Sequence, residues 1–290
     1  MRPAPDLPAR GDSDLVDHLH PDGVLDLGQG WRVRQPWLVA IGFALVPLMV
    51  IVTYSATAMV RELNMVATRL QTTAAMAALF ALGLMVMGRA PLALPDFGWR
   101  RPQHLKEVLW LAPIAVSIGL VLLILIIDGT DASPAAIGLG ALLAVFVGLA
   151  EETWYRGLVL RVLLPRGRTV AVFGSAMLFS VMHSAGLLGG AALVPTLLQV
   201  VFAMLFGVVT ALVTLRTGSL RPAIAWHAIH NTLSFPSRDE PTTAFVVGYG
   251  LIGLLLVGYA YWLFIEGAGD RRPKISGAPS PASEQNRPQY

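Results

Sequence analysis

The sequence predicts an all-α fold, namely a polytopic membrane helix bundle with about eight transmembrane helices. Of the 290 residues, 55% are hydrophobic and only 13% are charged, about half the charged fraction of an ordinary soluble domain. Several long apolar runs follow one another, each reaching the ~18 residues that a helix needs to cross a bilayer. The chain contains no cysteine, which excludes disulfides, thiolate zinc sites and cysteine nucleophiles.

Eight apolar segments are expected to form the transmembrane helices. They cover residues 37–60, 70–88, 108–127, 134–155, 169–188, 193–215, 219–235 and 243–265. The fourth should continue as helix to about Leu164, where Pro165 and Gly167 stop it. The seventh is the shortest, so we expect it to be tilted or partly enclosed by its neighbours.

The positive charges of the loops predict the orientation in the membrane. With eight spans, 18 of the 21 Lys and Arg residues fall on one side, and the other side has only Arg61, Arg69 and Arg238. Cytoplasmic loops carry an excess of Lys and Arg. We therefore predict a multi-pass protein of the cell membrane with both termini in the cytoplasm. This distribution also accounts for the net charge of +3 without a nucleic-acid partner.

Ionisable residues inside the spans gather in one part of the chain. They are Glu151, Glu152, Arg156, His183, His227 and His230. Such residues are costly in a bilayer and usually mark a site, a pathway or an internal pair. Helical rise puts Glu151 and His183 about 20 Å from the cytoplasmic ends of their helices, and His227 and Asn231 about 12 and 18 Å. These similar depths are what a shared site requires.

The fourth span also has a packing pattern. Small residues recur every four positions at Ala136, Gly140, Ala144 and Gly148. Such a stripe allows close helix approach, and Glu152 continues it, so we expect the two carboxylates to face protein. Glu152 and Arg156 have the i, i+4 spacing of an intrahelical ion pair.

Each of these polar residues also has a structural interpretation when it is taken alone. The glutamate–arginine pair could serve only to stabilise the end of a span, and His183 or His227 could be a packed, hydrogen-bonded histidine. Asn231 is most simply an interhelical hydrogen-bonding residue. His230 lies off the face shared by His227 and Asn231, so we expect it to be structural.

Three short motifs occur in order on predicted spans. They read EETWYR at 151–156, FSVMH at 179–183 and HAIHN at 227–231. This set matches EExxxR, FxxxH and HxxxN, and it resembles the CPBP family of intramembrane proteases. That family includes type II CAAX prenyl endopeptidases and the Abi group of bacteriocin-processing or self-immunity proteins. The resemblance covers roughly residues 134–240.

The resemblance implies a hydrolase in which four residues act on a peptide bond. Glu151 and His183 would activate a water molecule, while His227 and Asn231 would hold the developing oxyanion. A carboxylate or imidazole can accept a proton from water, and donors aimed at developing charge stabilise a tetrahedral intermediate.

The resemblance also implies a supporting pair and an alternative with a metal. Glu152, held by Arg156, would orient Glu151. If the enzyme is a metalloprotease, Glu151 or Glu152 with His183 and His227 would give Zn²⁺ three ligands and leave one position for water. The residues fit both mechanisms; we favour water activated by glutamate, with no cofactor.

We therefore predict an intramembrane endopeptidase that acts on a membrane-associated peptide or protein, with the prenylated CaaX type implied by the family name. The alternative is a non-catalytic membrane immunity or partner-binding protein of the Abi type. A proton-coupled transporter is disfavoured because the other spans lack ionisable groups for a relay. The predicted divisions are a polar cytoplasmic N-tail (1–36), a three-helix scaffold (37–127), the catalytic core (134–240), the last transmembrane helix (243–265) and a disordered C-tail (266–290).

Overall fold

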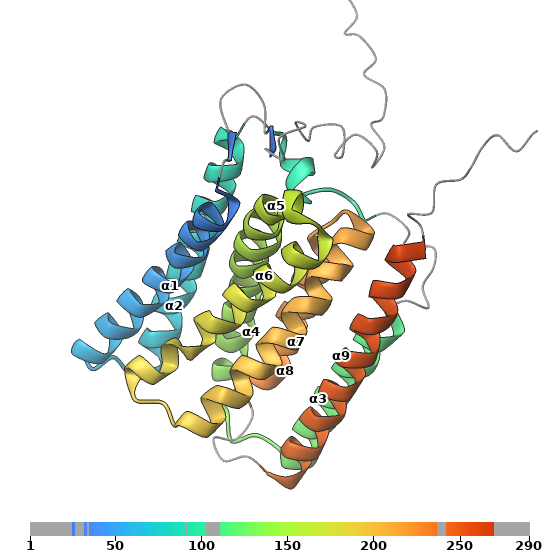
Figure 1. Ribbon diagram of the computed structural model, residues 1–290. Helices are drawn as coiled ribbons and strands as arrows, with labels where there is room; N and C mark the ends of the chain where they lie inside the picture. The colour runs from blue at the N-terminus through green and yellow to red at the C-terminus, as the bar shows by residue number, and fades with distance from the viewer. Residues whose placement is uncertain are drawn as a thin grey trace, which may run out of the picture.

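The helices of the computed structural model run up and down between the two ends of one bundle (Figure 1). Residues 25–26, 32–33, 35–90, 92–102, 111–236 and 242–269 are described. The expected N-tail and C-tail lie almost entirely outside these ranges. A pair of two-residue antiparallel strands, β1 (Leu25–Asp26) and β2 (Arg32–Val33), precedes the bundle. The rest of the secondary structure in the described ranges is helical, so the predicted all-α class is confirmed.

The helices follow the apolar segments of the sequence closely. They are α1 (Pro36–Val60), α2 (Met65–Arg89), α3 (Ala112–Asp128), α4 (Pro134–Glu152), α6 (Arg168–Met182), α7 (Leu193–Thr217), α8 (Arg221–Ser234) and α9 (Thr243–Gly269). Short 3₁₀ segments are η2 (Leu94–Phe97) and η6 (His183–Gly189). α4 continues without a break through the π-helical segment η4 (Thr153–Val159), α5 (Leu160–Leu163) and η5 (Leu164–Arg166).

The expected number of eight membrane-spanning helices is not confirmed. By length and composition, six helices of the described chain could cross a membrane: α1, α2, the continuous run Pro134–Arg166, the run Arg168–Leu188, α7 and α9. The other two expected spans are helical but shorter, with 17 residues in α3 and 14 in α8. Residues 108–110 of the expected third span lie outside the described ranges, and the expected seventh span begins two residues before α8.

Polar caps and glycines set where the central helices begin and end. The Ser133 hydroxyl accepts a hydrogen bond from the Ala136 amide and caps α4. Gly167 has a φ of +99°, which lets the chain leave η5 and enter α6 as a tight reversal. Gly218 ends α7 with a φ of +60°, and its carbonyl accepts a hydrogen bond from Arg100.

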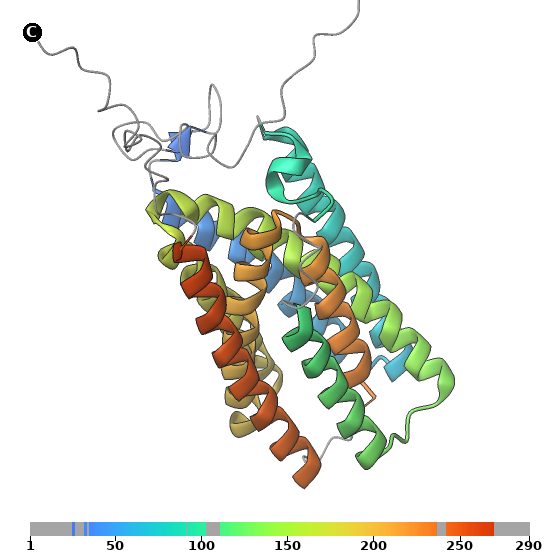
Figure 2. The ribbon, with the colours of Figure 1, turned by 90° about the vertical axis from the view of Figure 1, so that its right-hand side faces the viewer.

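The central helices pack most closely where the sequence has small residues. α4 lies between α2 and α8, α6 packs on α7, and α3 pairs with α9 (Figures 1 and 2). A Cβ added to Gly148 would lie 3.1 Å from the Ile224 carbonyl oxygen and 3.3 Å from the Ala228 nitrogen of α8. Gly148 therefore brings the two backbones together, as the small-residue stripe predicted.

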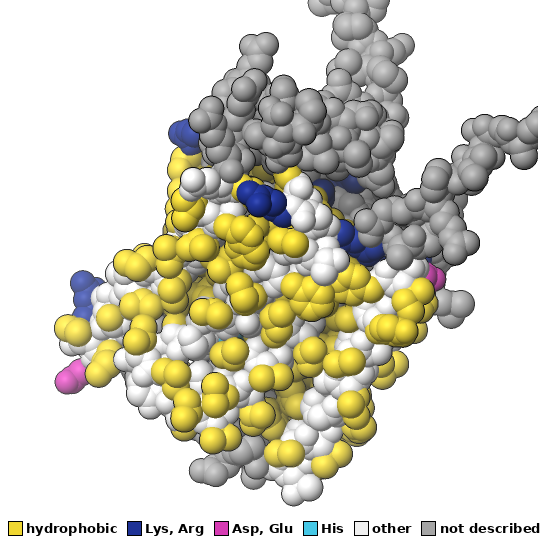
Figure 3. All heavy atoms as spheres, viewed as in Figure 1, with side chains coloured by type: hydrophobic (Ala, Val, Ile, Leu, Met, Phe, Trp, Pro, Cys, Tyr) yellow, Lys and Arg dark blue, Asp and Glu magenta, His cyan; other side chains and the backbone are white. Residues whose placement is uncertain are grey.

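The outside of the bundle is apolar between its two ends. Large hydrophobic side chains are exposed on all the longer helices, including Leu45, Leu123, Leu198 and Leu254. Hydrophobic side chains cover the face seen in Figure 3, while Lys and Arg side chains gather mainly toward the upper end. α1 begins and α9 finishes at this same end (Figures 1 and 2). An outer surface that is apolar between the two ends of the bundle is suited to the hydrocarbon core of a bilayer.

Candidate active site

The two glutamates lie at the end of α4, where the helix widens into a π-helical turn. Glu151 is 5% exposed and Glu152 is fully buried. All seven residues of the following π-helical segment are buried as well. Among them is Arg156, whose Nε lies 3.2 Å from Glu152 Oε2. This is the ion pair that the i, i+4 spacing predicted, and it places a cation beside a carboxylate that has no access to solvent.

His227 of α8 joins both glutamates. Its Nδ1 lies 2.9 Å from Glu152 Oε1, within hydrogen-bond distance, and its Nε2 lies 3.7 Å from Glu151 Oε2. A carboxylate can only accept, so Nδ1 carries the proton that it donates to Glu152. The ring therefore turns its other nitrogen toward Glu151. His227 can reach the glutamates because the backbones of α8 and α4 approach closely at Gly148, one helical turn before the carboxylates.

His183 lies at the other edge of the site, at the junction of α6 and η6. Its Nδ1 donates to the Phe179 carbonyl oxygen over 2.9 Å, one turn earlier in the same chain segment. The ring meets the Phe179 ring edge to face at 4.7 Å. Because Nδ1 carries the proton, a neutral ring has Nε2 free to accept one. Within the described ranges, no hydrogen bond or ion pair joins His183 to Glu151.

Asn231 and His230 occupy the next turn of α8. The Asn231 side chain is partly exposed and makes no hydrogen bond to any other described residue. His230 is buried, and its ring stacks on Phe202 with 5.1 Å between centroids. The structure thus brings Glu151, Glu152 and Arg156 of the first motif together with His227. It leaves His183 and Asn231 unbonded to this cluster.

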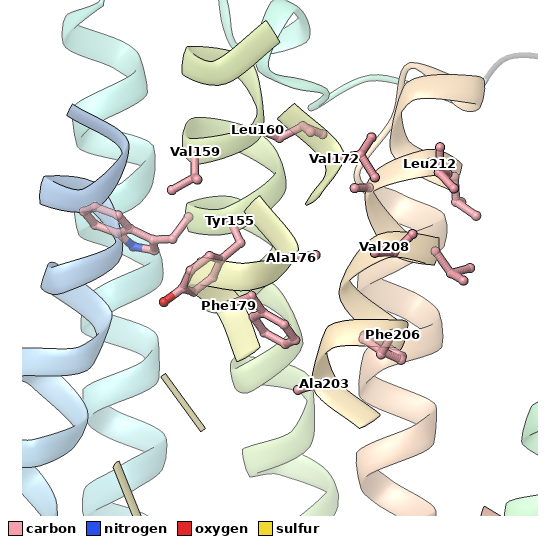
Figure 4. Close-up of a cluster of buried hydrophobic side chains, with 14 of the residues drawn as sticks. Tyr155, Val159, Leu160, Val172, Ala176, Phe179, Ala203, Phe206, Val208 and Leu212 are labelled. Carbon is pink, nitrogen blue, oxygen red and sulfur yellow. The ribbon is translucent and has the colours of Figure 1, made fainter. Parts of the chain in front are cut away.

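Two phenylalanines surround the cluster: Phe179, which begins the FxxxH motif, and Phe206, which lies outside the three motifs. The Phe179 ring lies under the Arg156 guanidinium, with 4.3 Å from the Arg156 Cζ to the ring centroid, a cation–π distance. Phe206 of α7 meets the His227 ring at 5.0 Å. Figure 4 shows Tyr155 and Phe179 next to one another and Phe206 facing them from α7. Phe206 has no sequence signal that separates its position from an ordinary core phenylalanine in an apolar helix.

Some buried polar atoms of the cluster have no hydrogen-bonding partner in the described chain. They are Oε2 of Glu151, Oε2 of Glu152 and the three guanidinium nitrogens of Arg156. Arg156 Nε and Glu152 Oε2 are within ion-pair distance of each other, so their charges are compensated. Glu151 Oε2 has only the His227 nitrogen at 3.7 Å. Buried polar atoms without a partner are costly, and they are found where a protein handles water or substrate.

The zinc set that the sequence allowed is not gathered into one group of ligands within the described residues. Among the described residues, no group of three or more His, Asp or Glu side chains could hold a metal ion. The Nδ1 atoms of His227 and His183 are bound to Glu152 and to the Phe179 carbonyl, which leaves both Nε2 atoms free, as in many metal-binding histidines. The expected three-ligand zinc site is nonetheless not assembled in this structure.

Part of the chain matches a known protein family. Residues 133–233 match the family model described as "Type II CAAX prenyl endopeptidase Rce1-like". No curated protein and no solved structure matches the chain. The matched segment begins at the cap of α4 and ends near the end of α8, so it contains all three motifs. The match thus supports the resemblance that the motifs carry over this segment, and the six apolar helices make this a multi-pass membrane protein.

Proposed function

We propose that this chain is an intramembrane endopeptidase whose general base is Glu151. The match of residues 133–233 to the type II CAAX prenyl endopeptidase Rce1-like family supports this class of activity. The observation that carries the proposal is the pairing of Glu151 with His227 inside the bundle. Glu151 Oε2 is buried, has no hydrogen-bonding partner in the described chain and lies 3.7 Å from His227 Nε2.

The distance between these two atoms suits a shared water molecule. A separation of 3.7 Å is too long for a direct hydrogen bond, but a water at about 2.8 Å from each atom can bridge it. Glu151, assisted by His183, takes a proton from this water while its oxygen attacks the carbonyl carbon. Glu151 then delivers the proton to the leaving nitrogen as the carbon–nitrogen bond breaks.

His227 and Asn231 are the proposed donors to the oxyanion of the tetrahedral intermediate. With protons on both nitrogens, His227 donates Nδ1–H to Glu152 and presents Nε2–H on the side of Glu151. In this form, the two carboxylates, Arg156 and His227 together carry no net charge, which favours their burial. The Asn231 amide has no partner in the described chain to compete with the substrate.

Glu152 and Arg156 act in this scheme by positioning other groups. Glu152 accepts from His227 Nδ1 over 2.9 Å and pairs with the Arg156 guanidinium at 3.2 Å. A carboxylate held on both sides fixes the orientation of the imidazole, as the carboxylate of a catalytic triad does. The pair therefore supports the histidine directly, rather than supporting Glu151 alone.

The proposed substrate is a membrane-associated peptide or protein, and a prenylated CaaX-type peptide is the first to test because the family description names that class. The purified protein in detergent is incubated with a panel of fluorogenic prenylated peptides. Glu151→Gln should lower kcat on the order of 10²–10⁴-fold, the usual contribution of a general base. His183→Ala should also lower kcat, whereas a zinc chelator should leave the rate unchanged.

Glu266→Gln is the matched control, because it removes the charge of a half-exposed carboxylate far from the site in the chain. Full activity in Glu151→Gln would contradict the proposed base, and loss of activity with the chelator would indicate a metalloprotease. A folded wild-type protein that cleaves no peptide of the panel but traps a membrane partner would favour the binding-protein alternative.

We also propose that both termini face the cytoplasm, because the Lys and Arg residues concentrate in the loops of that side. The chain has no cysteine, so single cysteines can report the topology. Arg101 and Asp131 are exposed and lie in loops that follow α2 and α3, at opposite ends of the bundle. In intact cells, an impermeant maleimide should label Asp131→Cys and leave Arg101→Cys unlabelled. The reverse pattern would overturn the orientation.

A further inference from the structure

Helix α7 carries none of the three motifs, yet it is the most enclosed of the six long apolar helices. In an 18-residue apolar stretch of each helix, 56% is buried in α7, compared with 17% in α1 and 22% in α9. Its middle part, which includes Phe206 and Gly207, is buried continuously from Phe206 to Thr214. Close packing of α7 is therefore concentrated beside the candidate site.

Phe206 and Phe179 enclose the His227 ring from two helices. The His227 and Phe206 centroids are 5.0 Å apart with 64° between the planes, and those of His227 and Phe179 are 6.1 Å apart with 88°. Both are edge-to-face arrangements, which aromatic rings prefer over a face-to-face stack. Phe206 is itself held by Trp226 at 4.4 Å and is only 3% exposed.

Gly207 allows α7 to lie this close to the charged cluster. A Cβ at Gly207 would come 3.0 Å from the Ala176 Cα of α6 and 3.3 Å from Arg156 Nη2. Both distances are tighter than ordinary van der Waals contact. The absence of a side chain here lets the α7 backbone contact α6 and the guanidinium at once, and it fixes the depth at which the neighbouring Phe206 enters the site.

We propose that Phe206 is a positioning residue for His227, an inference that rests on the proposed function. The hydrogen bond from Nδ1 to Glu152 fixes one atom of the imidazole and leaves the ring free to tilt about it. The two phenyl rings restrict that tilt, so that Nε2 stays turned toward Glu151. Phe206 contacts neither the proposed water nor the peptide bond; it acts through the orientation of His227.

The test separates the loss of the Phe206 aromatic ring from the loss of side-chain volume at this position. Phe206→Met removes the aromatic ring. The flexible methionine side chain can still fill most of the space that the ring occupied. Phe206→Tyr keeps the ring. Phe202→Met is the matched control: it makes the same change one turn earlier on α7, where the ring contacts His230 and Phe206, and no ring contact to His227 occurs in the described chain.

In the peptide cleavage assay, we expect Phe206→Met to lower kcat by about 10- to 100-fold, the cost of a misplaced catalytic group, with little change in KM. Phe206→Tyr should retain more activity than Phe206→Met, and Phe202→Met should keep the wild-type kcat. Thermal unfolding in detergent identifies variants that lose activity by unfolding. A Phe206→Met protein with wild-type kcat and wild-type stability would overturn the inference.

A second measurement does not depend on catalysis. The ring nitrogens of His227 are observed by ¹⁵N NMR in histidine-labelled protein and assigned as the signals missing in His227→Gln. These signals should shift or broaden in Phe206→Met and stay unchanged in Phe202→Met. Unchanged His227 signals in Phe206→Met would overturn the positioning role. Shifted signals in a protein that cleaves no peptide would support the positioning role while the proposed function fails.

Discussion

Charged side chains lie in different places in two groups of helices. The inner group consists of α4, α6, α7 and α8, and the outer group consists of α1, α2, α3 and α9. The inner group buries two carboxylates, a guanidinium and an imidazole within one cluster. In the described parts of the outer helices, Asp, Glu and Arg side chains lie within five residues of a helix end, as with Arg89, Asp128 and Glu266. Charge in the middle of a span is thus retained only where neighbouring helices supply partners for it.

The glycines show the same difference in packing. A Cβ added to Gly148 or Gly207 of the inner group would lie within 3.3 Å of another backbone or of the buried guanidinium. In the outer group, a Cβ added to Gly83 of α2 or Gly248 of α9 would meet side chains, and one added to Gly42 of α1 would have nothing within 4 Å. Close backbone approach is therefore a property of the helices that carry the polar cluster, since partners can meet buried charges only if the helices are near.

The largest expected effect comes from removing the buried cation. Arg156→Met should lower the free energy of unfolding by about 3–5 kcal/mol, because it leaves the Glu152 carboxylate buried without its arginine partner. Unfolding of the detergent-solubilised protein by heat or denaturant measures this loss. The double variant Glu152→Gln/Arg156→Met should recover part of it, since both charges of the pair are then removed. A loss below about 1 kcal/mol, the value for exposed pairs, would contradict the enclosed character of the cluster.

An intermediate effect should follow from widening the contact of α4 with α8. Gly148→Ala places a methyl group 3.1 Å from a backbone oxygen of α8, and overpacking of this kind costs about 1–3 kcal/mol. Because α8 carries His227, we also expect a lower kcat in peptide cleavage.

Gly138→Ala provides the control for this prediction on the same helix. Gly138 has nothing within 4 Å of its Cβ position, so alanine there should leave kcat unchanged and stabilise α4 by up to about 1 kcal/mol. Equal effects of the two substitutions on kcat would mean that helix propensity, and not the close approach at Gly148, explains the result.

The local features of the site could be predicted from the sequence because they depend on spacing within one helix. The ion pair between Glu152 and Arg156 follows from the i, i+4 spacing, and the contact at Gly148 follows from the small-residue stripe. The limits of most helices followed from hydropathy. The catalytic roles of Glu151 and His183 are still predictions, because contacts alone do not measure a reaction.

The features that depend on two helices could not be predicted. The hydrogen bond of His227 to Glu152 requires the relative rotation of α8 and α4, which one sequence does not contain. The π-helical segment Thr153–Val159 also has no signal in residue type, because its wide turn is stabilised by surrounding side chains. Phe206 was missed for the same reason, as its role comes from facing His227 rather than from its own chemistry.

The smallest expected effect belongs to the outer group. Glu266 of α9 pairs with Arg216 of α7 near the end of the bundle, with 39% of the Glu266 side chain exposed. Glu266→Gln should lower the free energy of unfolding by at most about 1 kcal/mol, because solvent screens a partly exposed pair and the Arg216 guanidinium keeps its contact with the Trp262 ring, 5.4 Å from the centroid. Peptide cleavage should keep its wild-type kcat. If Glu266→Gln abolishes cleavage at unchanged stability, α9 takes part in substrate handling, and the division into a charged inner group and an apolar outer scaffold fails at this helix.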